Sequence, residues 1–209
     1  SRFPRKDTCL AIYSRCVNTG EPLTPVLAGE FPWCATHEAA LAGLFREYAR
    51  RKQADGVLDY DDLLLWWDAA LEAPVVSESL RRAFDHVLVD EYQDTNRVQA
   101  SILKRLRPDG RGLFVVGDDA QSIYGFRGAD VHNLLDFERH FAPQARRITL
   151  TINYRSRQPV LDTANALMAE AANTLPKSLR AARGHSGARP ALVRVLDERE
   201  QADFVCDRL

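Results

Sequence analysis

The chain has 209 residues, which is enough for one large domain or two small ones. Apolar residues make up 45% of it and charged residues 27%, which excludes a wholly disordered or collagen-like chain. No apolar run approaches the roughly 18 residues that a transmembrane helix requires, and no signal peptide is recognisable, so we expect no membrane association. The four cysteines form no CxxC pair, which argues against a zinc ribbon and favours free thiols in a reducing cytoplasm.

Charge is balanced overall but unevenly distributed. The net charge of −1 argues against a simple basic nucleic-acid module. Residues 51–100 carry 11 acidic and 5 basic residues, net −6, whereas residues 139–194 carry 10 basic and 2 acidic residues, net +8. The chain begins with Ser1 rather than methionine, and we expect it to be a fragment of a longer protein.

The N-terminal part of the chain is predicted to be irregular and then helical. Prolines and glycines interrupt residues 1–34, where only a short helix over 8–17 is expected. Apolar residues then recur at i, i+3, i+4 and i+7. This spacing and the breakers between the segments predict helices over 36–52, 59–71 and 77–84.

The rest of the chain alternates short apolar runs with helical patterns. The runs cover 86–89, 113–116 and 147–150, and the helical patterns that follow them cover 96–107, 130–140 and 158–172. This alternation predicts an α/β fold with a parallel sheet. A loop over 174–190 and a further strand over 191–196 complete the prediction. Ligands of open parallel sheets bind at the carboxyl ends of the strands, so the polar residues after the three runs can converge on one crevice.

Two carboxylates follow the first predicted strand directly. An apolar strand ending in Asp90 and Glu91 is typical of folds that hold Mg²⁺ for nucleotide hydrolysis. The second carboxylate can polarise the water that attacks the γ-phosphate. The alternative interpretation is that these acids only solvate a turn, with Asn96 and Gln99 forming a capping box for the next helix.

The segment after the second predicted strand combines polar, aromatic and basic side chains. Gly117 permits a sharp turn, and the uncharged Gln121 suits the sensing of a phosphate oxygen. Tyr124, Phe126 and Arg127 place two rings and a guanidinium within four residues, a mixture that holds single-stranded nucleic acid. The alternative is that both aromatic residues belong to the core and that the arginine lies at the surface.

The third predicted strand leads into Tyr154 and Arg155. A tyrosine can stack on a purine base, and an arginine presented to a γ-phosphate neutralises transition-state charge, with an effect of about 10³–10⁵ on the rate. The alternative is a helix-capping Asn153 or Ser156 beside a surface arginine.

Together the three segments resemble motifs II, III and IV of the superfamily-one DNA helicases of the UvrD/Rep/PcrA type, and they read VDEYQDTN, VVGDDAQSIYGFRGA and LTINYRS. The stretch from Asp59 to Leu64, DYDDLL, is similar to the DFDDLL signature that precedes motif II in that family. The resemblance implies a helical insertion over residues 1–56, the C-terminal part of a first RecA-like, P-loop NTPase lobe over 57–146, and the beginning of a second RecA-like lobe over 147–209.

The resemblance also implies a nucleotide site with ATP and Mg²⁺ as cofactors. Asp90 would hold Mg²⁺, and Glu91 would activate the hydrolytic water. Gln121 would contact the γ-phosphate and couple it to DNA. Tyr154 would stack on adenine, and Arg155 would be the arginine finger of the second lobe.

Single-stranded and duplex DNA are the partners that the resemblance implies. Tyr124, Phe126 and Arg127 would lie on the DNA side of motif III. The parent would be an ATP-driven helicase or translocase moving 3′ to 5′, in the cytoplasm with the nucleoid. The carboxylates of 59–62 are interpreted as structural or capping groups rather than as a metal site.

The sequence departs from the family pattern in four respects. It contains no Gly-Lys dipeptide, so the phosphate-binding GxxxxGK[ST] loop is absent, as is the later arginine-bearing motif of the second lobe. Ala120 and Thr151 stand where acidic residues are common in the family. We interpret the two absences as truncation and predict that the 209-residue piece alone does not hydrolyse ATP.

Two other functions fit parts of the pattern. A catalytically inactive scaffold paralogue would bind DNA without turnover, although the intact Asp90, Glu91, Gln121 and Arg155 weigh against degeneration. A metal-dependent nuclease using Asp90 and Glu91 would leave Gln121 and Arg155 unexplained, and the sequence lacks the Glu-x-Lys that often follows in such sites.

Overall fold

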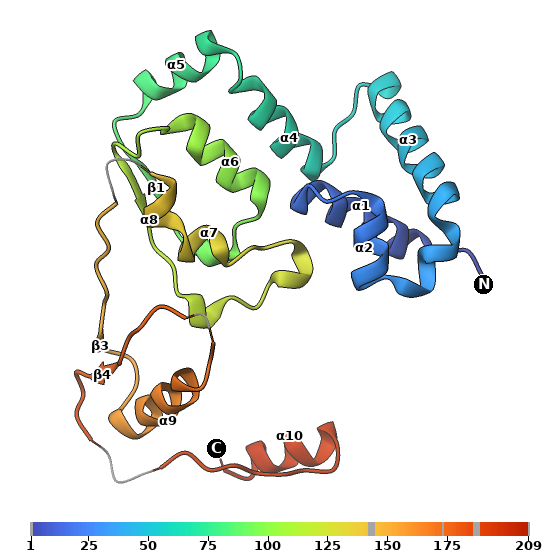
Figure 1. Cartoon of the computed structure of the whole chain (residues 1–209). Coiled ribbons are helices and arrows are strands. Elements are labelled where there is room, and N and C mark those ends of the chain that lie inside the picture. Colours follow the sequence, from blue (N-terminus) through green and yellow to red (C-terminus); the bar gives the residue numbers. More distant parts are fainter. Residues whose placement is uncertain (1, 142–144, 173, 186–188, 209) are drawn as a thin grey trace. The chain divides into compact units, whose positions relative to one another are not determined.

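The computed structural model describes residues 2–141, 145–172, 174–185 and 189–208 (Figure 1). The chain divides into two compact units, Ser1–Arg147 and Ile148–Leu209, which we call unit 1 and unit 2 and describe separately. Both contain helices and a small parallel sheet, so the α/β class is confirmed at that level. Among the described helices, none combines the length and apolar composition that crossing a membrane requires.

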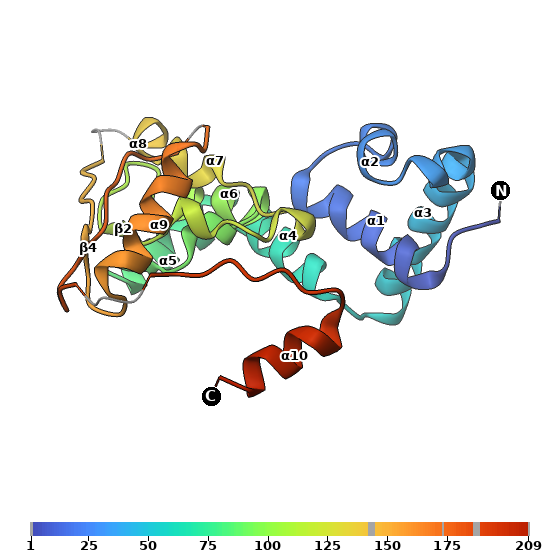
Figure 2. The same ribbon diagram turned by 90° about the horizontal axis from the view of Figure 1, so that it is seen from below.

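Unit 1 begins with helices that lie side by side (Figure 2) and share one small core. They are α1 (Lys6–Thr19), α2 (Leu23–Glu30), the 3-10 helix η1 (Pro32–His37) and α3 (Glu38–Asp55). Ile12, Val26, Leu27 and Leu41 are at most 1% exposed at its centre. The predicted helices over 8–17 and 36–52 are confirmed, but α2 lies in the stretch predicted to be irregular. Pro25 occupies the first turn of α2, where a missing N–H costs no helical hydrogen bond.

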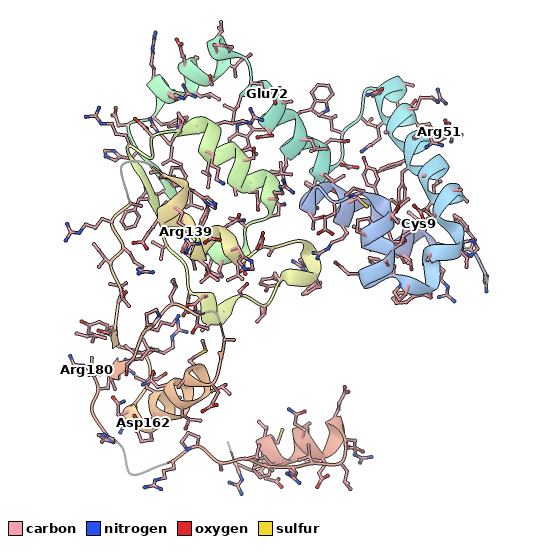
Figure 3. The ribbon with its side chains drawn as sticks, in the orientation of Figure 1. Cys9, Arg51, Glu72, Arg139, Asp162 and Arg180 are labelled. Carbon is pink, nitrogen blue, oxygen red and sulfur yellow. The ribbon has the colours of Figure 1, made fainter. Side chains whose placement is uncertain are left out.

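Three further helices lie close to their predicted ranges: α4 (Tyr60–Ala70), α5 (Pro74–Ala83) and α6 (Arg97–Leu106). Arg105 ties α6 to α4 and the turn after it, because it pairs with Asp68 and with Glu72 at 2.9 Å each. Figure 3 labels Glu72 in the turn between α4 and α5. The predicted capping box of α6 is confirmed. Asn96 Oδ1 accepts the Gln99 backbone N–H at 2.8 Å, and Gln99 Oε1 accepts the Asn96 backbone N–H at 2.9 Å.

Two short parallel strands form the sheet of unit 1. β1 (Val87–Val89) pairs with β2 (Leu113–Val115), as the runs 86–89 and 113–116 predict. Gly112 leads into β2 at φ 72°, and a Cβ there would lie 2.4 Å from the carbonyl oxygen of Asp85, so only glycine fits. Because the strands are parallel, the residues that follow them emerge at the same edge of the sheet.

Short elements follow each strand: η2 (Tyr92–Asp94) after β1, then η3 (Asp119–Gln121), η4 (Gly125–Arg127), α7 (His132–Leu135) and α8 (Phe137–His140) after β2. The single helix predicted over 130–140 is therefore wrong. Asp136 interrupts it at φ −98° and ψ 10°, and its carboxylate pairs with Arg139 at 2.9 Å. Aspartate is a weak helix former because its side chain competes for backbone and local partners.

Unit 2 contains a second parallel sheet and two helices: β3 (Ile152–Asn153), α9 (Gln158–Ala169), β4 (Arg180–Ala181) and α10 (Glu198–Cys206). The helix predicted over 158–172 is confirmed, but the strands predicted over 147–150 and 191–196 are wrong, and β4 lies in the predicted loop. Leu150 and Leu192 of those runs are 77% and 89% exposed. A strand needs a hydrogen-bonded neighbour, and neither run has one among the described residues. β3 therefore belongs to a sheet of its own, not to that of unit 1.

Candidate functional site

The first two predicted site residues lie at the carboxyl end of β1. Asp90 follows the strand directly, and one of its carboxylate oxygens accepts the Glu91 backbone N–H at 2.9 Å. Glu91 adopts the left-handed conformation, with φ 50° and ψ 42°, and no other described non-glycine residue has a positive φ. A glutamate held in this region is strained, and such strain concentrates at functional sites.

Gln93 connects this end of β1 to the end of β2. Its side-chain N–H donates to Glu91 Oε2 at 2.7 Å, and its side-chain carbonyl accepts the Asp118 backbone N–H at 2.9 Å. The residue is 1% exposed. Sequence reasoning did not select Gln93, although the same argument that selected Gln121, an uncharged amide that both donates and accepts, applies to it.

Gln121 joins the same network from η3. Its side-chain N–H donates to Asp118 Oδ2 at 2.8 Å, while Asp118 Oδ1 accepts the Ala120 backbone N–H at 3.0 Å. Hydrogen bonds therefore link Glu91, Gln93, Asp118 and Gln121 in sequence. The structure brings the predicted residues Asp90, Glu91 and Gln121 to one sheet edge, as the parallel strands imply.

The predicted DNA-binding residues form a cluster of their own. The ring centroids of Tyr124 and Phe126 are 6.0 Å apart, and the Arg127 guanidinium carbon lies 5.2 Å and 5.5 Å from them. Phe126 is 71% exposed and Tyr124 37%, so the alternative that both are core residues is wrong. Exposed rings beside a cation suit stacking on bases and contact with phosphate.

Helix α1 supports the loop that carries this cluster. Arg15 donates from Nη1 to the Gly125 carbonyl oxygen at 2.6 Å and pairs through Nη2 with Glu30 at 2.6 Å. Gly128 has φ 85°, and a Cβ there would lie 3.0 Å from the Asn18 side chain. Asn18 in turn accepts from Asn96 at 2.6 Å, which connects α1 to the segment after η2.

The carboxylates of residues 59–62 have the capping role that was predicted. Asp59 and Asp62 form the capping box of α4, and both accept from the buried Lys52 at 2.6 Å. Burial opposes the lysine charge, but these hydrogen bonds outweigh it and raise the pKa of Lys52 above its ordinary value. Burial likewise opposes the charge on Asp59, and hydrogen bonds from Lys52, the Asp62 backbone and Tyr48 nevertheless lower its pKa. In the part of the chain that the structure describes, no group of three or more His, Cys, Asp or Glu side chains is arranged to hold a metal.

Tyr92 anchors η2 beneath the site. Its ring is fully buried and packs edge-on against Phe137 with centroids 5.5 Å apart. Burial raises the pKa of Tyr92 to about 12. The hydroxyl has no hydrogen-bond partner among the described residues, so this tyrosine contributes packing rather than chemistry.

Tyr154 and Arg155 follow β3 in unit 2. Asn153 accepts the backbone N–H groups of Arg155 at 2.9 Å and Ser156 at 2.7 Å, which forms a local turn. Helix α9 has Arg157 as its N-cap and no side-chain cap, so the alternative of a helix-capping Asn153 or Ser156 is wrong. Tyr154 is 70% exposed and lines a hollow of about 460 Å³ together with Arg180. Because these residues belong to a different unit from Asp90, their completion of one shared site stays a prediction.

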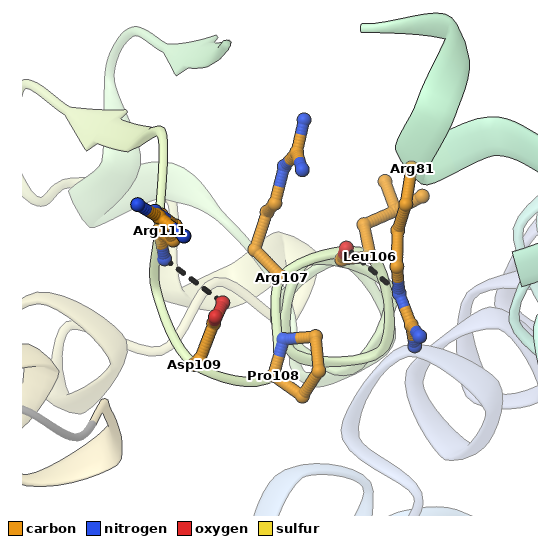
Figure 4. Close-up of a pocket in the computed structure, with 6 residues that line it drawn as sticks. All are labelled: Arg81, Leu106, Arg107, Pro108, Asp109 and Arg111. Carbon is orange, nitrogen blue, oxygen red and sulfur yellow. Dashed lines mark hydrogen bonds between the residues drawn. The ribbon is translucent and has the colours of Figure 1, made fainter. Parts of the chain in front are cut away.

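A second hollow, of about 480 Å³, lies at the opposite edge of the sheet in unit 1 (Figure 4). Arg81 and Arg107 line it, but both donate to backbone carbonyls, Arg81 to Leu106 at 3.2 Å and Arg107 to Phe84. Its position before β2, away from the carboxyl ends of the strands, argues against a ligand site.

Comparison with known proteins decides the family. A family model described as the UvrD/REP helicase N-terminal domain matches residues 26–142. The chain belongs to the UvrD/REP helicase family. It is 38% identical over 170 residues to the ATP-dependent DNA helicase PcrA of Staphylococcus aureus and 42% identical over 180 residues to the ATP-dependent DNA helicase UvrD1 of Mycobacterium tuberculosis. Each alignment covers 81% of this chain and 23% of the relative, so the chain spans about a quarter of the length of these relatives.

The resemblance inferred from the three motifs is thus confirmed. The UvrD/REP match includes the whole network from Asp90 to Gln121 and the aromatic cluster with Arg127, whereas Tyr154 and Arg155 lie beyond the matched residues.

Proposed function

We propose that this chain is part of an ATP-dependent DNA helicase that couples hydrolysis to 3′-to-5′ movement along single-stranded DNA. The observation that carries the proposal is the hydrogen-bonded edge of unit 1, where Asp90, Glu91 and Gln121 lie together a few residues before the cluster of exposed rings and Arg127. Membership of the UvrD/REP family supports it. Such an enzyme would act in the cytoplasm, with the nucleoid.

The proposal includes the arrangement of lobes. Residues 1–56 would form a helical insertion, 57–146 the C-terminal part of a first RecA-like lobe and 147–209 the beginning of a second. The two separate parallel sheets are compatible with two lobes.

Asp90 would hold Mg²⁺ when ATP is bound. The residue fits this role because it is exposed at a strand end and one of its carboxylate oxygens is not used by the Glu91 N–H. Mg²⁺ accepts one or two protein carboxylates and completes its coordination with water and substrate phosphates. When bound, the ion neutralises charge on the phosphates during transfer.

Other residues of the chain have the remaining roles in ATP hydrolysis and DNA binding. Glu91 orients and deprotonates the attacking water, and its carboxylate is held toward Gln93. Gln121 contacts the γ-phosphate, Tyr154 stacks on adenine, and Arg155 neutralises charge as phosphate transfer proceeds. The exposed Tyr124, Phe126 and Arg127 hold single-stranded DNA.

Replacing Glu91 by Gln tests the proposal directly. In the full-length protein, we expect single-turnover ATP hydrolysis to slow by about 10²–10⁴-fold, because the base is lost while the shape is kept. Glu47→Gln is the matched control, since Glu47 lies on α3 and its ion pairs among the described residues are with Arg50 and Arg51. Equal hydrolysis by Glu91→Gln and wild type would refute the catalytic assignment. The 209-residue piece alone should not hydrolyse ATP, and DNA-stimulated turnover by it would contradict that expectation.

A further inference from the structure

We propose that Gln93 is a positioning residue that couples the Glu91 carboxylate to the loop bearing Asp118 and Gln121. This inference rests on the proposed ATP hydrolysis and deepens it. In this proposal, the buried Gln93 amide links the position of the residue that activates water to the positions of the residues that contact phosphate and DNA.

The amide of Gln93 uses both of its ends in one orientation. Its N–H donates to the carboxylate of Glu91 at 2.7 Å, and its carbonyl accepts the backbone N–H of Asp118 at 2.9 Å. A flipped amide would place oxygen against the carboxylate and N–H against N–H, which excludes the alternative. A leucine would fill the same volume, but only a group that both donates and accepts connects the two strand ends.

The connection continues from Asp118 into the DNA-side segment. The Asp118 carboxylate accepts from the Gln121 side chain at 2.8 Å, and the Ser122 hydroxyl donates to the Gln93 backbone carbonyl at 3.4 Å. Tyr124 follows two residues after Ser122. Displacement of the Asp118 backbone would therefore move the base of the aromatic cluster, and the Glu91 carboxylate would follow through Gln93.

Gly117 leaves the space that this contact requires. A Cβ at Gly117 would lie 2.9 Å from Gln93 Oε1 and 3.2 Å from the Leu134 side chain. Its φ is not positive, so the glycine is required for close approach rather than for an unusual backbone conformation. Glycine at position 117 thus leaves room for the Gln93 amide, which a side chain there would displace.

Gln93→Met in the full-length protein removes the side-chain hydrogen bonds to Glu91, Asp118 and, at 3.5 Å, Asp94 while keeping the volume. We expect kcat for ATP hydrolysis with oligo-dT present to fall about 10–100-fold, with KM for ATP little changed, as when a supporting hydrogen bond to a reacting group is lost. Stimulation by oligo-dT should fall with it. Gln99→Met is the matched control, because Gln99 makes an equivalent side-chain bond in the α6 cap, to the Asn96 backbone rather than to Glu91 or Asp118. It should lower thermal stability and leave kcat unchanged.

Gln93→Glu supplies a readout that a purely structural role would not change. At neutral pH its carboxylate would face the Glu91 carboxylate, and activity should be lost. When the new carboxyl is protonated at lower pH, its O–H can donate to Glu91, and kcat relative to wild type should recover. Gln93→Met should show no such recovery, and a Gln93→Glu profile parallel to wild type would overturn the proposal.

The outcomes separate the two proposals. Wild-type protein without DNA-stimulated hydrolysis would defeat the proposed function itself. Active wild type together with unchanged kcat in Gln93→Met would defeat only the coupling role. If Gln93→Met does not fold, Gly117→Ala displaces the amide without removing it and should lower the same kcat, and unchanged activity in that folded variant would also overturn the coupling.

Discussion

The two units place their motif residues after a pair of short parallel strands, but they hold them differently. In unit 1, side chains join segments that are distant in sequence: Gln93 bonds to Asp118, and Asn18 bonds to Asn96, 78 residues away. In unit 2, the Asn153 side chain accepts from the backbone N–H groups two and three residues further on. The motif side chains of unit 1 are thus held by bonds between distant segments, whereas the Asn153 side chain, directly before Tyr154, is held in a local turn.

This difference between the units affects the conformational entropy that ligand binding costs. Among the described residues, the Tyr154 hydroxyl and the Arg155 guanidinium have no hydrogen-bond partner, and both side chains are exposed. Ordering them would cost conformational entropy at the moment of binding, whereas Gln93 is ordered during folding. The comparison predicts that substitutions of the exposed Tyr154 and Arg155 change rates without changing stability, and that substitutions in the unit 1 network change stability.

The largest effect is expected at Arg155. In the full-length protein, Arg155→Ala should lower DNA-stimulated kcat by about 10³–10⁵-fold, the effect of losing an arginine finger. The unfolding free energy should change by less than about 0.5 kcal/mol, because the side chain is exposed. Arg157→Ala, two residues away and also exposed, is the control and should leave both quantities near wild type. A large loss of stability in Arg155→Ala would contradict the inferred difference between the two units.

Lys52→Met should produce a large loss of stability. Removing the lysine leaves Asp59 and Asp62 without their buried cation and should cost about 3–5 kcal/mol in urea unfolding. Arg51→Met is the control, because Arg51 is exposed and its pairing with Glu47 contributes little.

The same variant changes the pH dependence of folding. Asp59 has a lowered pKa when folded, so its contribution is present above its ordinary pKa of 3.8 and is lost as pH falls through the folded value. Wild-type stability should therefore decrease on acidification below about pH 4–5, and Lys52→Met should lose the part of that dependence that comes from the Lys52–Asp59 hydrogen bond. A pH profile identical to wild type would contradict the assignment.

Replacing one asparagine by alanine in each unit tests the difference between the units. Asn18→Ala should weaken unit 1 by about 1–3 kcal/mol, because it leaves the buried Asn96 side-chain N–H without its acceptor. Asn153→Ala should weaken unit 2 by about 0.5–1.5 kcal/mol, since it loses only local bonds. Hydrogen exchange of the amides in each unit measures the two effects separately. Equal losses would show that long-range and local bonds contribute alike.

The smallest effect is expected at Tyr92. Tyr92→Phe removes a buried hydroxyl that has no described partner, so stability should stay unchanged or rise slightly. Tyr92→Ala, which empties the same site, should cost about 3–5 kcal/mol. A clear loss in Tyr92→Phe, measured by thermal unfolding, would indicate that the hydroxyl takes part in the network.

The sequence predicted what depends on local pattern. The helical spacing around Leu41, the strands before Asp90 and Gly117, and the capping box of Asn96 and Gln99 are each decided within a few residues, and all are present. The prediction of irregular structure failed at α2 because Pro25 is compatible with a first helical turn.

Long-range pairing explains the other failures. The apolar runs over 147–150 and 191–196 have strand-like composition, but a strand exists only with a neighbour, which composition does not reveal. Gln93 was missed for the same reason. Its partner Asp118 is 25 residues away, and only the parallel pairing of β1 with β2 brings them together.

The left-handed backbone of Glu91 has a consequence for engineering. At φ 50°, glycine or asparagine would relieve strain of about 1–3 kcal/mol that glutamate imposes. A selection for thermal tolerance alone would therefore favour substitutions at the one position proposed to activate water. Libraries built to stabilise this domain should keep residue 91 constant, because the improved variants found there would be well folded and inert.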